Sequence, residues 1–396
     1  MKRMTLPYGV QDYLPDECYH KNLAERRICD TFSSFGYERI ETPALEYSDL
    51  YAGVVPMERM FKLTDNDGGL LVLRPDTTLQ VCRMAAKMRF SGVKKLYYTE
   101  NSFEYLPNVY TSRTREFAQA GVELLGESGA DGDVEVITLA IEAFLSTGLK
   151  DFLIEIGDVR FFKCIMRGCG LDEADAQTIR TYIDNKDQLG LEVFLQRKGV
   201  DAEFKEKFLL LPSLFGKSDV LDAAGRLCGD DSCAAVLDRL RYVSGRLHER
   251  GYGKYISFDL GLLRGLNYYS GLVIKGLAAG MGLSVLDGGR YDDIGGSFRP
   301  GMHAVGFAIG IKRLLVALDA DEPLTGAPPC EYAYANFGAP EASVQAYVRK
   351  LRAMGKRVTE CFAADRRALT AFARENGIGR IIVFTSAGAE EAEVRG

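Results

Sequence analysis

The chain has 396 residues, of which 47% are hydrophobic and 26% are charged, a balance typical of globular domains and sufficient for two or three of them. No run approaches the ~18 apolar residues of a membrane helix, and residues 1–15 lack the apolar stretch of a signal peptide, so we expect a cytoplasmic protein without membrane contact. The net charge of −6 argues against a protein that binds nucleic acid mainly through bulk charge.

The nine cysteines are expected to be reduced, because their number is odd and no secretion signal precedes them. Two pairs, Cys164/Cys169 and Cys228/Cys233, share a C-x4-C spacing. Zinc sites generally use the tighter C-x2-C spacing or nearby histidines, and all three histidines lie far from both pairs. We therefore expect no metal site.

The first elements expected are a helix over residues 16–35, ended by Gly36, and a strand over 37–40. Pro43 follows this strand closely and indicates an edge or interface strand. A strand is expected over 70–73, and a helix follows it to about residue 87.

Two polar residues near the start of that second helix, Asp76 and Thr78, have two interpretations. Asp and Thr beside a helix start commonly accept hydrogen bonds from its free amides, and the same position suits contact with a ligand. The two roles can coexist, and the sequence leaves both open.

Residues 97–126 predict an antiparallel hairpin whose return strand alternates strictly. One face, formed by the even-numbered residues 118–124, is apolar. The other places Gln119 and Glu123 on either side of Gly121, which leaves room for a ligand against the backbone. The alternative is an ordinary sheet with one solvated face, and spacing alone does not decide between them.

The remaining chain predicts an α+β core, a helical insertion and a small second domain. A helix over 134–144 and a strand over 152–157 precede polar, helix-period sequence at about 171–253, which we interpret as the insertion. Glycine-rich strands follow, and six glycines are expected to interrupt them, namely Gly265, Gly271, Gly288, Gly289, Gly295 and Gly296. The core is thus expected over 1–323, and a β-α-β-α-β module over 330–396.

Six segments, taken together and in order, resemble those of class II aminoacyl-tRNA synthetases, in the histidyl-tRNA synthetase branch. FGYERIETPALEY resembles the first class II motif, a dimer-forming strand that ends in proline. The resemblance implies a mixed, mainly antiparallel sheet flanked by helices, and self-association through the first motif. The five others are LRPDTT, FAQAGVELLG, RGLNYYSGLV, GGRYDD and AVGFAIGIKRLL.

In that branch these segments form a pocket for histidine. The pocket suits an amino acid, because carboxylates can bind the ammonium and imidazole N–H groups, an arginine can bind the carboxylate, and aromatic walls exclude water. An Asp stands at position 76, where the branch usually has Glu. Carried over by position, the histidine-binding residues are Asp76, Thr78, Gln119, Glu123, Arg264, Tyr268 and Tyr269.

The chain departs from the synthetases in the second motif, where they carry F-R-x-E. Here Glu104 replaces the arginine that binds the α-phosphate of ATP, and Leu106 replaces the glutamate that contacts adenine. A carboxylate in place of a cation should disable adenylate formation. Some capacity to bind anions is expected from residues that fit other family arginines, namely Arg113, Arg115 and Arg313; Lys312 stands where synthetases usually have glutamate.

The C-terminal module resembles an anticodon-binding domain that lacks its last strand and helix, so tRNA binding is not expected. Its basic residues, Arg349, Lys350, Arg352, Lys356 and Arg357, are interpreted as solvated helix and turn charge.

With a histidine pocket and a disabled ATP site, the chain resembles the regulatory subunits of short-form ATP phosphoribosyltransferase. That family is a non-catalytic paralogue of histidyl-tRNA synthetase. The resemblance implies no catalytic residues and no cofactor, and a hetero-octamer with the short catalytic subunit. It also implies activation of the first step of histidine biosynthesis and a contribution to feedback inhibition by histidine. The alternatives are a divergent histidyl-tRNA synthetase and an amino-acid sensor or tRNA-like-domain binder outside this pathway.

Overall fold

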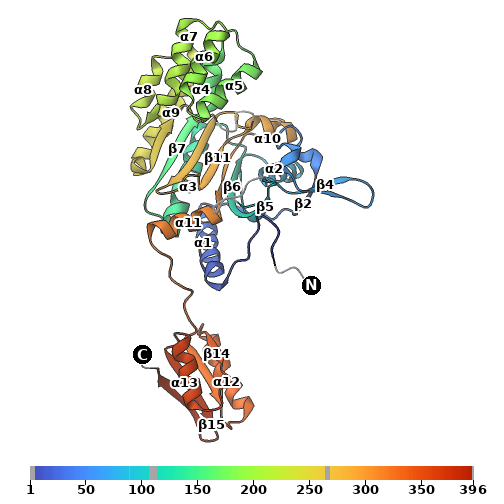
Figure 1. The fold of residues 1–396 in the computed structure, drawn as a ribbon, viewed down its shortest axis with the longest axis vertical. Coiled ribbons are helices and arrows are strands. Elements are labelled where there is room, and N and C mark those ends of the chain that lie inside the picture. The colour runs from blue at the N-terminus through green and yellow to red at the C-terminus, as the bar shows by residue number, and fades with distance from the viewer. Residues whose placement is uncertain (1–4, 89, 107–113, 264–267, 395–396) are drawn as a thin grey trace. The chain divides into compact units, whose positions relative to one another are not determined.

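The chain divides into two compact units, Met1–Leu324 and Thr325–Gly396. The division is seen in a computed structural model that describes residues 5–88, 90–106, 114–263 and 268–394 (Figure 1). The unit boundary lies at the start of the Pro- and Gly-containing segment 324–329.

A nine-stranded sheet forms the centre of the first unit, with the strand order β1-β5-β6-β12-β11-β10-β7-β9-β8. Six of its eight strand pairs are antiparallel, and only β1·β5 and β7·β9 are parallel. The strands are β1 (Glu38–Arg39), β5 (Lys94–Phe103), β6 (Glu116–Leu125), β7 (Phe152–Asp158), β8 (Phe215–Gly216), β9 (Ile256–Asp259), β10 (Leu272–Ala278), β11 (Leu286–Arg290) and β12 (Ala304–Gly310).

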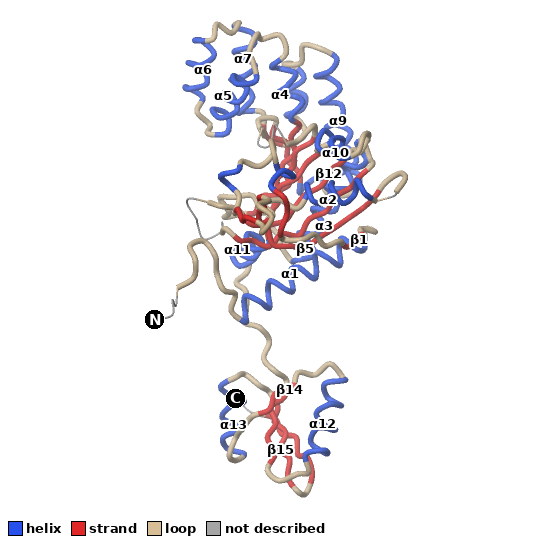
Figure 2. The backbone as a smooth tube through the Cα atoms, turned by 90° about the vertical axis from the view of Figure 1, so that its right-hand side faces the viewer, coloured by secondary structure: helices blue, strands red, loops and turns tan. Residues whose placement is uncertain are grey.

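The main core lies between one face of this sheet and three helices, α1 (Pro15–Ser34), α3 (Ala130–Thr147) and α11 (Ile311–Asp321) (Figures 1 and 2). The predicted hairpin is β5 and β6, and its apolar face contributes Ala118, Ala120, Val122 and Leu124 to this core. The opposite face of the sheet points away from these three helices.

The predicted helix, with its end at Gly36, and the predicted edge strand near the N-terminus are confirmed. Helix α1 ends next to Gly36, whose φ of +80° favours glycine. Strand β1 is the first strand in the sheet order and pairs only with β5.

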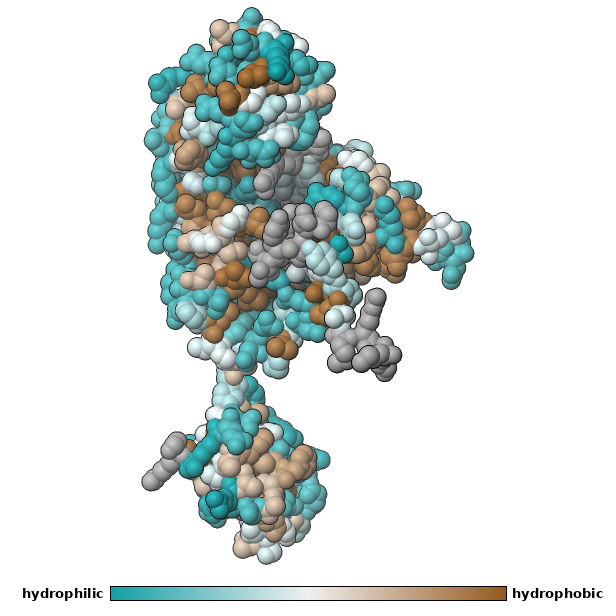
Figure 3. Space-filling view, viewed as in Figure 1, coloured by the Kyte–Doolittle hydropathy of each residue, from teal (hydrophilic) through white to brown (hydrophobic). Residues whose placement is uncertain are grey.

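A separate three-stranded sheet, in the order β2-β4-β3, exposes apolar side chains. Leu45 and Tyr47 on β2, and Leu63 and Leu70 on β3 and β4, are each at least 40% exposed. Figure 3 shows apolar residues at the surface over this sheet. Helix α2 (Thr78–Lys87) follows its last strand; the strands are β2 (Leu45–Tyr47), β3 (Lys62–Thr64) and β4 (Leu70–Leu73).

The helical region begins earlier than the sequence indicated, at Val159 rather than near residue 171. Helix α4 was missed because its sequence, VRFFKCIM, is a short apolar run that continues directly from a buried strand. It belongs with the later helices, since it packs against α9. The helices are α4 (Val159–Met166), α5 (Glu173–Asp184), α6 (Gln188–Arg197), α7 (Ala202–Leu210), α8 (Val220–Gly225) and α9 (Asp231–Glu249).

The expectation that six glycines interrupt strands is right for two of them. Gly288 and Gly289 lie within β11, Gly271 directly precedes β10, and Gly265 lies outside the described residues. Gly295 and Gly296 lie instead in a short helix, α10 (Asp292–Phe298). The sequence GGRYDDIGG gave no helical period, and Asp292 and Asp293 in the first turn favour the helix electrostatically.

The second unit contains the predicted β-α-β-α-β module and one strand more. The extra strand, β16, pairs antiparallel with β15. Its sequence, GAEEAE, has no apolar alternation, and backbone hydrogen bonds to β15 hold it at the sheet edge. The elements are β13 (Tyr332–Asn336), α12 (Glu341–Ala353), β14 (Val358–Glu360), α13 (Arg366–Glu375), β15 (Arg380–Thr385) and β16 (Gly388–Glu393).

No helix in the described ranges is long and apolar enough to cross a bilayer. All nine cysteines are unpaired thiols, as the sequence predicted. Among the same residues, no group of three or more His, Cys, Asp or Glu side chains is arranged to hold a metal ion.

Candidate functional site

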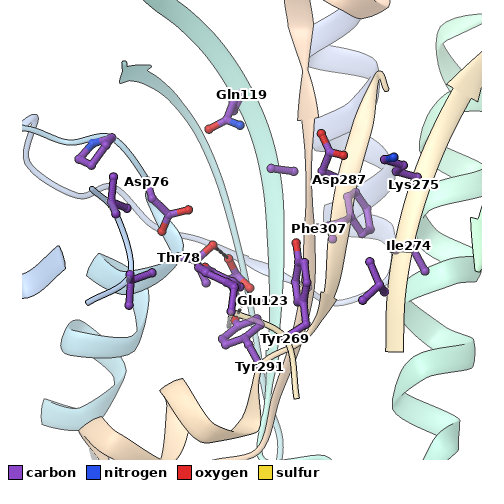
Figure 4. A pocket seen from close by; sticks show the side chains of 18 of the residues that line it. Asp76, Thr78, Gln119, Glu123, Tyr269, Ile274, Lys275, Asp287, Tyr291 and Phe307 are labelled. Atoms are coloured by element: carbon purple, nitrogen blue, oxygen red, sulfur yellow. Dashed lines mark hydrogen bonds between the residues drawn. The ribbon is translucent and has the colours of Figure 1, made fainter. Parts of the chain in front are cut away.

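A cavity of about 410 Å³ lies on the sheet face opposite the main core. Its floor is formed by β6, β10, β11 and β12, and its walls include the start of α2 (Figure 4). Of the predicted histidine-binding residues, the structure brings Asp76, Thr78, Gln119, Glu123, Tyr268 and Tyr269 together in its lining. Arg264 lies outside the described residues.

Glu123 is the most buried carboxylate of the cavity, with 1% of its surface exposed. The Thr78 hydroxyl donates to its Oε1 at 2.8 Å, and the Tyr291 hydroxyl donates to its Oε2. Burial raises the pKa of Glu123 to about 8, and the nearby Asp76 carboxylate adds to the rise, although both hydrogen bonds oppose it. The solvated-face alternative is therefore wrong at this end of β6.

Glu123 is expected to make the chain lose stability as pH rises toward neutrality. Its raised pKa means that the folded state keeps a proton that the unfolded chain releases above about 4.5, so stability is full below that pH and falls up to about 8. Between pH 5.5 and 7 this amounts to ~2 kcal/mol.

The variant Glu123→Gln removes this titration. The free energy of unfolding in urea is measured for both proteins at both pH values. The value for the variant minus that for the original chain should be larger at the higher pH, by the amount given above. Parallel pH dependences of the two proteins would contradict the assignment.

Asp76 has both of the roles that the sequence left open. Its Oδ1 accepts a hydrogen bond of 3.0 Å from the amide of Leu79, in the first turn of α2, and its side chain also lines the cavity. Desolvation by the surrounding protein raises its pKa to about 6, against the opposing effect of the backbone hydrogen bonds.

Gln119 lies farther along β6, at the wall of the cavity (Figure 4). Its side-chain oxygen accepts a hydrogen bond of 3.0 Å from the Ser102 hydroxyl on β5. The amide nitrogen has no donor role in this contact and remains available for a ligand carboxylate or carbonyl.

Four tyrosines and Phe307 form the aromatic part of the lining, and two of the tyrosines, Tyr98 and Tyr291, were missed by sequence reasoning. The Tyr268 ring lies 5.1 Å from that of Tyr269 and 5.9 Å from that of Tyr291, measured between centroids. Tyr98 could have been found from the hairpin register, because it lies opposite Gly121. A Cβ at Gly121 would collide with the Tyr98 ring, so this glycine makes room for the tyrosine.

An ion pair separates this cavity from a second one. Glu104, at the position that distinguishes the chain from synthetases, accepts hydrogen bonds from Nε (2.6 Å) and Nη2 of Arg59. Both residues line both cavities. Sequence reasoning missed Arg59, which lies 45 positions from its partner, and no local pattern marks it.

The second cavity, of about 230 Å³, contains one of the predicted anion-binding arginines. Arg313 lines it together with Lys312, but Arg313 already pairs with Asp287 at 3.5 Å. Arg115 lines neither cavity: it donates two hydrogen bonds to the Leu106 carbonyl and stacks on the rings of Tyr8 and Tyr105. Arg115 was predicted to bind anions, but the structure does not place it in either cavity. Arg113 lies outside the described residues.

The sequence matches the family model described as histidyl-tRNA synthetase over residues 9–314. The ATP phosphoribosyltransferase regulatory subunit of Acetivibrio thermocellus is 39% identical over 322 residues, which cover 80% of this chain and 77% of the relative. The protein of the same description from Desulforamulus reducens is 35% identical over 389 residues, covering 97% of this chain and 96% of the relative.

Two solved structures are similar along nearly the whole chain. One, from Bacillus halodurans, is described as an ATP phosphoribosyltransferase regulatory subunit/histidyl-tRNA synthetase; it has a TM-score of 0.85 and 26% identity, with 97% of this chain and 99% of that chain covered. The histidyl-tRNA synthetase of a Nostoc species shares the fold, with a TM-score of 0.83 at 22% identity and coverage of 99% and 97%. The class II synthetase-like fold expected from the sequence is confirmed.

Proposed function

Because the chain belongs to the histidyl-tRNA synthetase-like family, and within it to the ATP phosphoribosyltransferase regulatory subunits, we propose that it activates the short catalytic subunit of that enzyme in histidine biosynthesis. In this role it is not itself a catalyst. It contributes instead to feedback inhibition by histidine.

The observation that carries the regulatory function is the Arg59–Glu104 pair. A synthetase needs a cation for the α-phosphate of ATP at the position of Glu104, and this chain presents a carboxylate there. The neighbouring cation, Arg59, is already neutralised by it. An ATP phosphate would meet repulsion from Glu104 and would have to compete for Arg59. This arrangement disfavours the alternative of a divergent synthetase.

The proposed site for histidine is the 410 Å³ cavity. Its described residues supply two carboxylates for cationic groups of the ligand and an aromatic wall that excludes water. Arg264 completes the proposed set from the resemblance alone. For histidine to regulate, its binding free energy must differ between active and inhibited assemblies, typically by 1–3 kcal/mol.

The proposed assembly is a hetero-octamer with the catalytic subunit, located in the cytoplasm, with self-association through the N-terminal strands. The exposed apolar residues on the β2-β4-β3 sheet support self-association, because contiguous apolar surface at a sheet commonly marks an interface. The surface that binds the catalytic subunit is not assigned.

Mixing the purified chain with the short catalytic subunit is expected to raise phosphoribosyl transfer at least about tenfold over either protein alone. Histidine should then inhibit the mixture by roughly 5- to 150-fold, the range of ordinary allosteric coupling. The measurement is the rate of phosphoribosyl-ATP formation, with size-exclusion chromatography to detect the complex. Catalysis by the short subunit that is unaffected by this chain would contradict the proposal.

A further inference from the structure

Two cations line the main cavity within the described part of the chain, Arg59 and Lys275, and they differ in their partners. Arg59 is paired with Glu104. Lys275 has no carboxylate within 4.0 Å among the described residues, although it is partly buried in the lining of the same cavity. An unpaired ammonium in such a place is costly unless water or a ligand solvates it.

The acid across from Lys275 on one side is already engaged elsewhere. Lys275 lies on β10 directly across from Asp287 on β11 and from Glu155 on β7. Asp287 accepts a bifurcated hydrogen bond from the Ser284 hydroxyl, at 2.8 Å to each carboxylate oxygen, and pairs with Arg313. Lys275 could instead have a purely structural role, in which its charge stabilises these acids at long range without contacting a ligand. A test must distinguish that role from ligand binding.

Lys275 lies at the opposite end of the cavity from the buried carboxylate. The Glu123 carboxylate lies over β12, because a Cβ at Gly306 would collide with its Oε2. Strand β10 is two strands away, a spacing of ~10 Å, and Tyr269 lies between them against Gly289 on β11. Figure 4 shows Asp76 and Glu123 on one side of this space and Lys275 on the other.

This distribution of charge suits a dipolar ligand. An amino acid carries a cationic and an anionic group together, and a monovalent cation or anion alone would leave one end of the cavity unsatisfied.

We propose that Lys275 binds the carboxylate of the cavity's ligand, in addition to Arg264, to which the resemblance gives that role, so that an amino acid lies across β12, β11 and β10 with its cationic end at Glu123. This inference rests on the proposed function, because it takes the regulatory amino acid to occupy this cavity. It assigns Lys275 a role in specificity: the residue selects ligands that carry a carboxylate.

The test is calorimetric titration of the full chain with histidine and with histidinol, which has a hydroxymethyl group in place of the carboxylate. Lys275→Met is expected to weaken histidine binding by about 10- to 100-fold, because a charge-assisted hydrogen bond is lost. It should change histidinol binding by less than about threefold. Lys275→Arg should keep most of the affinity for histidine, and Lys350→Met, an exposed lysine of the second unit, should alter neither ligand.

Equal losses for both ligands would overturn the proposal, since a lysine that acts only on the neighbouring acids cannot sense the ligand's carboxylate. Unchanged histidine binding in Lys275→Met would overturn it as well. Failure of the original chain to bind either ligand would instead refute the proposed site itself, a result distinct from both. Retained histidinol binding by Lys275→Met excludes misfolding of that variant as the cause of its loss of histidine binding.

Discussion

Glu123→Ala is expected to abolish histidine binding in practice, with a loss of affinity of at least about 100-fold. The substitution removes the buried carboxyl group that faces the cationic end of the ligand and leaves the hydroxyls of Thr78 and Tyr291 without their acceptor. Hydrogen bonds to a charged group contribute ~1.5–3 kcal/mol each, and 1.4 kcal/mol corresponds to a factor of ten.

The affinity of the original chain should also rise with pH. Glu123 has a pKa of about 8 in the empty cavity, so most of it is neutral near pH 7 and must release its proton to bind a cation. Affinity should therefore increase by up to about tenfold per pH unit below pH 8, and this dependence should vanish in Glu123→Gln.

Isothermal titration at several pH values measures both effects. Glu116→Ala is the matched control, because Glu116 lies on the same strand, hydrogen-bonds to Asn101 and lines neither cavity. In the complex with the catalytic subunit, Glu123→Ala should still activate but should no longer transmit inhibition by histidine. Full inhibition by histidine in that variant would show that the inhibitor binds elsewhere.

Glu104→Arg is expected to tighten the binding of ATP by roughly 100-fold. The substitution removes a carboxylate from the boundary of the two cavities and leaves Arg59 free beside a second guanidinium. Two unit charges 4 Å apart interact by ~4 kcal/mol at an effective dielectric constant of 20, and partial exposure of Arg59 reduces that value.

Equilibrium dialysis with ATP, at fixed ionic strength, measures this effect. Glu116→Arg makes the same change of charge on β6 outside both cavities and should leave ATP binding within a fewfold of the original. The original chain should catalyse no pyrophosphate exchange with histidine and ATP. If it exchanged robustly, or bound ATP as tightly as Glu104→Arg, the regulatory function would be wrong and the synthetase alternative would stand.

Much of the site was predictable because two of its residues lie on one strand, β6, whose alternating sequence is easy to recognise. The alternation of β6 places Gln119 and Glu123 on one face and the core alanines on the other, and this depends only on the period of a strand. Asp76 and Thr78 were already candidates from their place at a helix start, and resemblance to the synthetase segments added the two tyrosines at 268 and 269.

The site residues that could not be predicted from the sequence share one property. Tyr98, Arg59 and Lys275 have ordinary local surroundings in the sequence, and they acquire a role only from their neighbours across strands or from a distant loop. The same reason explains α4 and β16. Helix α4 packs on a helix about 70 residues away, and β16 is held by its pairing with β15.

The sequence by itself determined the fold class, most of the order of the elements and the loss of the phosphate-binding arginine, because periodicity and motif order are properties of the chain alone. Only the tertiary structure decided that Glu123 is buried and largely protonated, that Glu104 is neutralised by Arg59, and that Lys275 remains unpaired. The physical reason is that burial and charge pairing depend on which groups folding brings within a few ångströms of one another, and sequence separation carries little information about that.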